Sequence, residues 1–166
     1  MKTKALTAVA LLVLLLLPGV SHALTDDQTA LVGLKGVQVV VEKIDPQAEL
    51  LGLTKAQIKT EVELRLRKAG IRVLTGKERL ETPEMPWLYV NVTVFPPQDL
   101  PLAAFSIHVE LKEIVTLANG STTVGSIWDT GYVGIVGKEK IREMRKLVDD
   151  YVDKFINDYL AANPKK

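Results

Sequence analysis

A β-hairpin built around Asn119-Gly120 limits the possible folds of this chain more than any other stretch. Asn-Gly supplies the two positive-φ residues that a two-residue type I′ turn needs, so we expect a hairpin over residues 105–136. Strand side chains alternate between two faces, and this turn brings apolar pairs together on one of them. The expected pairs on that face are Val115 with Val124, Leu111 with Trp128, Val109 with Thr130 and Ile107 with Tyr132. The other face, which we expect to be wetter, pairs Ser106, His108, Glu110, Lys112 and Thr116 with Val133, Gly131, Asp129, Ile127 and Thr123.

The first amphipathic helix has clear start and stop signals in the sequence. Thr54 and Gln57 form a capping box, so the helix is expected to begin directly after Thr54. Gly70 stands where a left-handed residue ends a helix, and Leu66 with Ile71 matches the apolar contact of a Schellman motif.

The remaining elements follow from apolar runs and their spacing. Residues 37–44 are rich in β-branched side chains, 71–74 form a short apolar run, and aliphatic residues alternate through 87–95. The spacing of apolar residues predicts a long amphipathic helix over about residues 138–162. The succession of strand, helix and strand is a crossover unit, which favours parallel pairing of its two strands. The sequence therefore predicts an α+β fold: a single mixed sheet of about five strands, in the order β-α-β-β-β-β-α, with two helices on one face.

The first residues predict export. Lys2 and Lys4 precede an apolar run over residues 5–17, Pro18-Gly19 interrupts it, and Ser21-His22-Ala23 offers small residues for a signal peptidase. A membrane anchor is the alternative, but a run of about 13 residues is well short of the roughly 20 that span a bilayer as a helix. We therefore expect residues 1–23 to be a cleaved signal peptide. No cysteine follows the run to carry a lipid, so the mature protein is expected to be periplasmic or secreted and soluble.

The expected mature chain fits one domain. Removing 23 of the 166 residues leaves 143, which divide into a flexible lead-in over residues 24–36 and a single α+β domain over 37–166. Removal of Lys2 and Lys4 lowers the basic count from 21 to 19 against 20 acidic residues, so the net charge is about −1. This balance gives no support for nucleic-acid binding. The absence of cysteine excludes disulfides and favours a bacterial envelope protein.

No catalytic, metal or cofactor constellation stands out. Ser106, His108 and Asp129 can be drawn as a triad on the outer face of the hairpin, but no nucleophile elbow accompanies them. One histidine without cysteine cannot supply a typical zinc site. Gly131, Gly134, Gly137 and Lys138 lead from a strand into a helix, but the spacing matches neither a dinucleotide fingerprint nor a P-loop. We therefore expect no cofactor and no enzymatic activity.

The remaining candidate is an interaction surface on the outer sheet face. Its expected residues are Trp87, Tyr89, Phe95, His108, Ile114 and Ile127. Exposed aromatic residues in a row can bind a protein, a peptide strand or a lipid-like ligand. The alternative is that loops or the lead-in cover these side chains as a small second core.

Several segments resemble a group of uncharacterised exported bacterial proteins, and the similarity covers most of the mature chain. The segments are 41–46 (VEKIDP), 52–54 (GLT), 62–71 (VELRLRKAGI), 88–92 (LYVNV) and 155–160 (FINDYL). The resemblance implies an envelope location and supplies no activity. The element order is also similar to that of small α/β domains of periplasmic assembly factors, such as the amino-terminal domain of TolB, a likeness of fold that carries no function.

Together these observations predict an exported, non-enzymatic binding or assembly module. Its partner is expected to be an envelope protein or peptide, with no nucleic acid and no transmembrane anchor after cleavage. The alternative is a carrier of a small apolar ligand held between the sheet and the C-terminal helix. A concave apolar pocket would favour the carrier, and a flat exposed face would favour the module.

Overall fold

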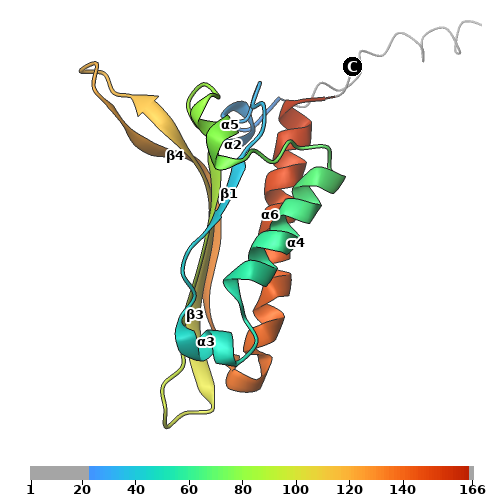
Figure 1. The fold of residues 1–166 in the computed structure, drawn as a ribbon, viewed down its shortest axis with the longest axis vertical. Helices are drawn as coiled ribbons and strands as arrows, with labels where there is room; N and C mark the ends of the chain where they lie inside the picture. Colours follow the sequence, from blue (N-terminus) through green and yellow to red (C-terminus); the bar gives the residue numbers. More distant parts are fainter. Residues whose placement is uncertain (1–22, 165–166) are drawn as a thin grey trace, which may run out of the picture.

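The computed structural model describes residues 23–164, and these form an α+β fold around a single mixed sheet (Figure 1). The predicted signal peptide lies outside the described residues except for Ala23. The elements, in chain order, are α2 (Asp26–Thr29), β1 (Gln38–Val41), α3 (Pro46–Leu50), α4 (Lys55–Lys68), α5 (Gly76–Leu80), β2 (Trp87–Phe95), β3 (Leu102–Thr116), β4 (Thr122–Gly137), the 3-10 helix η1 (Lys138–Glu143) and α6 (Met144–Ala162).

The sheet has four strands in the order β1-β2-β3-β4, fewer than the five expected. β1 runs parallel to β2, and the β2–β3 and β3–β4 pairs are antiparallel. The predicted strand over residues 71–74 is reduced to a single parallel bridge between Val73 and Val37. It ends at once because Thr75, the next residue after this segment, caps the following helix α5.

The hairpin differs from the prediction at its turn. Leu117 N donates to Ser121 O (2.8 Å), so three residues, Ala118 to Gly120, form the loop, and of these only Gly120 has positive φ (+82°). This is a three-residue hairpin loop and not the expected type I′ turn. Near the tip the pairing is therefore shifted by one residue: Val115 faces Thr123 and Lys112 faces Ser126.

A β-bulge between Leu111 and Lys112 then restores the predicted register. Ile127 is the extra residue on β4, and beyond it Leu111 faces Trp128, Val109 faces Thr130 and Ile107 faces Tyr132. Three of the four predicted pairs on the apolar face are thus confirmed, whereas the pairing of Val115 with Val124 is wrong because the loop is one residue longer than expected.

Helix α4 begins and ends where the sequence signals indicate. Thr54 accepts a hydrogen bond from Gln57 N (3.4 Å), but the predicted capping box is only half formed, because the Gln57 side chain accepts from the Thr54 hydroxyl (3.0 Å) and not from its backbone N–H. At the other end Ile71 N donates to Leu66 O (2.9 Å) and Gly70, with φ of +83°, donates to Arg67 O (3.0 Å), the two bonds of a Schellman motif.

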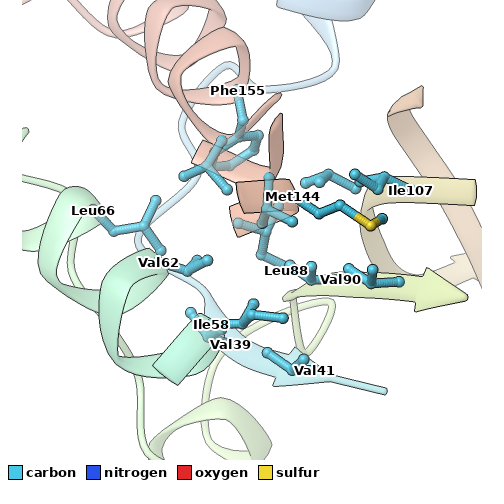
Figure 2. Packing of buried hydrophobic residues seen from close by; sticks show 14 of the residues in the cluster. Val39, Val41, Ile58, Val62, Leu66, Leu88, Val90, Ile107, Met144 and Phe155 are labelled. Atoms are coloured by element: carbon cyan, nitrogen blue, oxygen red, sulfur yellow. The ribbon is translucent and has the colours of Figure 1, made fainter. Parts of the chain in front are cut away.

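Helices α4 and α6 pack side by side against the same face of the sheet (Figure 1). Figure 2 shows the apolar layer between them, in which Val62 and Leu66 of α4 and Met144 and Phe155 of α6 are buried against strand residues such as Leu88. We call this the inner face of the sheet. Its buried strand residues are Val39, Val41, Leu88, Val90, Val92, Val94, Ala103, Phe105, Ile107, Val109, Leu111 and Trp128.

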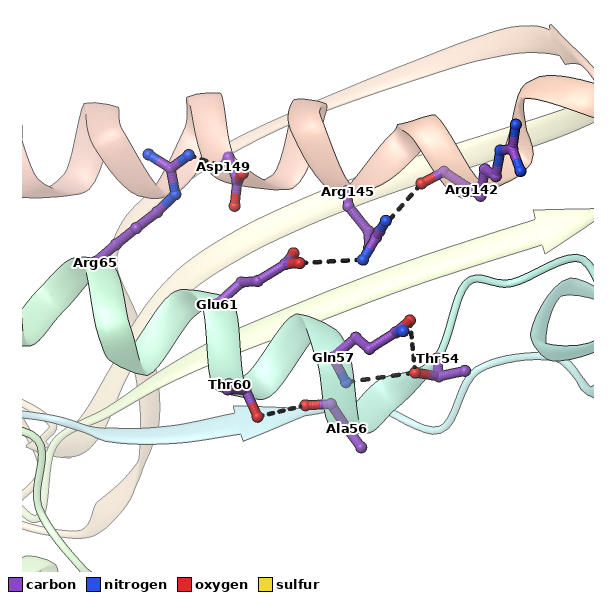
Figure 3. Close-up of polar contacts among 9 residues, drawn as sticks. All are labelled: Thr54, Ala56, Gln57, Thr60, Glu61, Arg65, Arg142, Arg145 and Asp149. Carbon is purple, nitrogen blue, oxygen red and sulfur yellow. Dashed lines mark hydrogen bonds and ion pairs between the residues drawn. The ribbon is translucent and has the colours of Figure 1, made fainter.

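Ion pairs tie the two long helices together on their solvent side (Figure 3). Arg65 donates to Asp149 (2.7 Å) and to Asp153 (2.7 Å), and Arg145 donates to Glu61 (3.1 Å). The hydrogen bond to Asp149 is the largest of the effects that raise the pKa of Arg65. The pairs fix how α4 lies along α6 more than they add stability, because partly exposed ion pairs are worth little.

The segment before β1 packs onto α6. Leu31 is fully buried, Tyr159 Oη donates to Leu34 O (3.2 Å), and Asn163 Nδ2 donates to Leu31 O (2.9 Å). Asp158 links three elements, because it accepts hydrogen bonds from Gln28 of α2 (3.1 Å) and from the indole of Trp128 of β4 (3.0 Å).

Candidate interaction surface

The outer face of the sheet is built from alternate residues of β2, β3 and β4. Five cross-strand rows follow from the strand registers: Trp87–Lys112–Ser126, Tyr89–Glu110–Asp129, Asn91–His108–Gly131, Thr93–Ser106–Val133 and Phe95–Ala104–Ile135. The first three rows are mainly polar, whereas the last row is apolar. The face therefore changes character from one end to the other.

Polar and charged side chains partly cover the two predicted aromatic residues at the polar end. The Arg79 guanidinium lies 5.0 Å from the centre of the Trp87 ring, and Lys112 Nζ lies 4.5 Å from the centre of the Tyr89 ring. The Tyr89 hydroxyl donates to the Glu42 carboxylate, which lowers the pKa of Glu42 and raises the pKa of Tyr89. Both rings are half-buried, so this end already has partners within the chain.

The opposite end exposes large apolar side chains. Phe95 is 69% exposed, Leu102 46%, Val133 69% and Ile135 72%. We call these four residues the apolar end. Of the four, the predicted interaction surface included only Phe95. The predicted register had already placed Val133 on the outer face, and Ile135, two residues later, shares that face because strand side chains alternate.

The six predicted residues therefore do not form one patch. His108 is exposed in the middle of the face, beside Gly131, where a Cβ would lie 2.8 Å from His108 Nδ1. Ile114 lies farther toward the hairpin tip and is half-buried. Ile127 was expected on the outer face, but as the bulge residue it packs against the core on the inner side.

The edge of β4 is the second feature of this region. β4 is the last strand of the sheet, and its pairing is with β3. Lys138 N donates to Pro101 O (2.9 Å), and since hydrogen-bonded and non-hydrogen-bonded pairs alternate in an antiparallel ladder, the backbone groups of Ile135, Val133 and Gly131 point away from β3. The eight residues from Thr130 to Gly137 contain no proline and no charged residue, the usual guards of an exposed edge.

The other edge of the sheet is guarded. β1 has four residues, and its beginning is joined to the segment after α4: Val37 N donates to Arg72 O (3.0 Å) and Leu74 N donates to Val37 O (2.8 Å). Only β4 therefore offers a long open edge among the described strands.

The residues drawn as a possible triad do not make a catalytic contact in the structure. Ser106, His108 and Asp129 lie in successive rows of the outer face, and within residues 23–164 no hydrogen bond joins them. In the same part of the chain no group of three or more His, Cys, Asp or Glu side chains is placed to hold a metal ion.

A recess of 340 Å³ lies between residues 30–35 and the loop 82–86. Two carboxylates line it, and burial together with the nearby Glu84 raises the pKa of Glu113. Glu84 (φ +59°) and Met85 (φ +48°) have left-handed backbone conformations, which the bonds from Ile114 N to Glu84 O (2.8 Å) and from Arg79 to Met85 O (3.1 Å) hold in place.

The space between the sheet and α6, where a carried ligand was expected, is filled by side chains. Phe155 and Trp128 meet there edge to face at 5.2 Å, and both are buried together with Val148, Val152 and Ile107. This packing does not favour the carrier hypothesis.

No protein-family model matches the chain, and no curated protein is similar to it at a significant level. Among residues 23–164, no helix has the length and apolar character that a membrane span requires. The apolar end and the open β4 edge lie next to each other on the outer side of the sheet.

Proposed function

We propose that this protein is an exported, non-enzymatic binding or assembly module of the bacterial envelope, and that it binds by adding a strand to the open edge of β4. The observation that carries the proposal is the segment from Gly131 to Ile135, where outward-pointing backbone groups lie next to exposed apolar side chains. Strand addition uses both features, because backbone hydrogen bonds supply affinity and alternate side chains supply specificity.

The apolar end extends the proposed site across the outer face. A strand added beside β4 would place every second side chain next to Val133 and Ile135, which are 69% and 72% exposed. Phe95 and Leu102 lie farther in on the same face, so a longer partner could reach over them. Because the beginning of β1 is already hydrogen-bonded to the segment after α4, a partner strand is expected beside β4 and not beside β1.

A photo-crosslinking amino acid at position 135 of the full-length chain tests this proposal in the bacterium that produces the protein. We expect an ultraviolet-dependent adduct at position 135 and none at position 93. Thr93 is a matched control because it is exposed on the same face but lies on β2, two strands away from the edge.

The adduct also separates the possible partners by mass. A shift equal to the chain's own mass identifies a second copy, and any other shift identifies a different protein. Equal adducts at both positions would indicate binding through the face and not through the edge. The absence of an adduct at position 135 would contradict the proposed function.

Export is tested separately by the mass of the protein recovered from the envelope fraction. Cleavage after Ala23 predicts a mature chain that begins at Leu24. Recovery of the uncleaved chain from the cytoplasm would contradict the proposed location and leave the binding test unaffected.

A further inference from the structure

The open edge of β4 has a residue pattern that matches a second copy of the same strand. We propose that two copies of this protein pair antiparallel through their β4 edges, across a two-fold axis at Val133. This inference rests on the proposed function, because it names the partner of the same edge. It joins two four-stranded sheets into one continuous sheet.

The backbone supports this geometry. The outward-pointing groups belong to Gly131, Val133 and Ile135, which are spaced symmetrically about Val133. In an antiparallel pair centred there, Val133 of each copy exchanges two hydrogen bonds with Val133 of the other. Gly131 exchanges two with Ile135 of the second copy, so every outward group of this segment is satisfied.

The side chains fit the same register. Ile135 lies opposite Gly131 of the second copy on the outer face, and Tyr132 lies opposite Gly134 on the inner face. Each large side chain is thus opposed by a glycine, which leaves room for it. Tyr132 is 54% exposed in the single chain, so pairing would also cover apolar surface.

Charge disfavours the neighbouring registers. An axis one residue earlier, at Tyr132, would place Asp129 opposite Ile135 and press a carboxylate against an apolar side chain. An axis one residue later, at Gly134, would place Asp129 opposite Glu139, and like charges opposite each other are unfavourable.

In the proposed register Asp129 lies opposite Gly137 of the second copy. The Glu139 carboxylate lies against Gly137, but two lysines, Lys138 and Lys140, flank Glu139 in the sequence. Residues 138–140 carry a net charge of +1, and the residue directly opposite Asp129 is a glycine without a charged side chain. Residues 130–136 of the two copies, all of them uncharged, lie opposite one another in this register.

The pairing closes on itself. A two-fold axis makes the same patch serve both copies, so the dimer uses up the open edge of each β4 and does not grow into a fibre. This would protect an otherwise unguarded edge from aggregation.

Single cysteines test the register, because the chain has no cysteine of its own. Val133→Cys places its two sulfurs across the axis, within reach of a disulfide, whereas Ile135→Cys separates them by roughly 13 Å along the strands, too far to bridge. Ile135 is the matched control, since it is equally exposed on the same strand and face. We expect oxidation of the purified mature protein to give a covalent dimer with Val133→Cys and little with Ile135→Cys.

Sedimentation of the purified mature protein tests the assembly. We expect the unmodified protein to be dimeric, Val133→Lys to weaken the dimer at least tenfold, and the control Thr93→Lys to leave it unchanged, with circular dichroism confirming that both variants are folded. A monomer at every concentration, or equal cross-linking of both cysteine variants, would overturn the pairing. An adduct of foreign mass at position 135 together with a monomeric protein would overturn this inference and leave the proposed function standing.

Discussion

The two faces of the sheet consist of alternate side chains of the same strands, but the two sets of side chains are covered differently. On the inner face the alternate side chains of β1 and β2, and of β3 from Ala103 to Leu111, are apolar and buried under α4 and α6. On the outer face the polar rows are satisfied by neighbours, as in the 3.1 Å ion pair between Lys112 and Glu110, and the apolar end is left exposed. The contrast indicates that stability resides on the inner face, which leaves the outer face and its edge available for binding.

The largest expected effect is on the inner face. Leu111→Ala removes a fully buried side chain opposite Trp128 and should lower the free energy of unfolding by about 2–5 kcal/mol. His108→Ala, on the exposed side of the same strand, should change it by less than about 0.5 kcal/mol. Urea unfolding of both variants measures the contrast, and similar losses would remove the distinction between the faces.

The next effect concerns the polar contact at the border of the core. Asp158→Ala leaves the indole N–H of Trp128 without its acceptor and should cost about 1–3 kcal/mol. Gln28→Ala, which removes a single donor to Asp158 on the surface side, is the control and should cost less.

Asp158 also predicts a pH dependence. Burial acts to raise its pKa, but the hydrogen bonds from Lys154, Trp128 and Gln28 outweigh burial, and the pKa is lowered. A lowered folded-state pKa stabilises the fold above the unfolded-state pKa, and this stabilisation is lost as pH falls through the folded-state value. Asp158→Asn should flatten that part of the curve of unfolding free energy against pH; an unchanged slope would assign the acid loss to other groups, such as Glu78, whose pKa is lowered to about 2.

A smaller effect is expected on the outer face. Lys112→Ala removes the ion pair with Glu110 and the contact with the Tyr89 ring, and should cost at most about 1 kcal/mol, because partly exposed pairs contribute little. A loss as large as that of Leu111→Ala, measured in the same urea series, would make the polar rows a second core.

The smallest expected effect has the opposite sign. Burial and Glu84 raise the pKa of Glu113, so its ionised form destabilises the fold, and this cost develops as pH rises from the unfolded-state to the folded-state pKa. Glu113→Gln should therefore be slightly more stable than the parent at pH 7, and the gain should vanish in acid. A variant that is less stable at pH 7 would indicate that the carboxylate has an attractive partner in the recess.

The elements that could be predicted are those whose start and stop signals lie in their own sequence. The ends of α4 were predictable because Thr54 and Gly70 act within one helical turn, and the inner face was predictable because alternation requires only neighbouring residues. The short helices were missed although their caps are visible in the sequence: Asp45 before Pro46, and Thr75 three residues before Glu78. Five-residue helices have no periodicity that would distinguish them from turns.

The candidate site was harder to predict because it depends on contacts between distant residues. Arg79 lies over Trp87 and Lys112 over Tyr89, and neither contact leaves a pattern in the sequence, so the expected row of free aromatic rings is half covered. The open edge at β4 depends on strand order, which alternation does not reveal. Of the six predicted residues, Phe95 and His108 are exposed, and the other four are half-buried.

The bulge at Ile127 separates the strand register of the hairpin tip from that of the core. Because the bulge absorbs the one-residue offset of the loop, the Leu111–Trp128 pairing does not depend on the loop geometry. The tip also projects beyond the helices (Figure 1). A foreign peptide inserted between Ala118 and Gly120 should therefore be displayed at the tip without a change in the packing of the core.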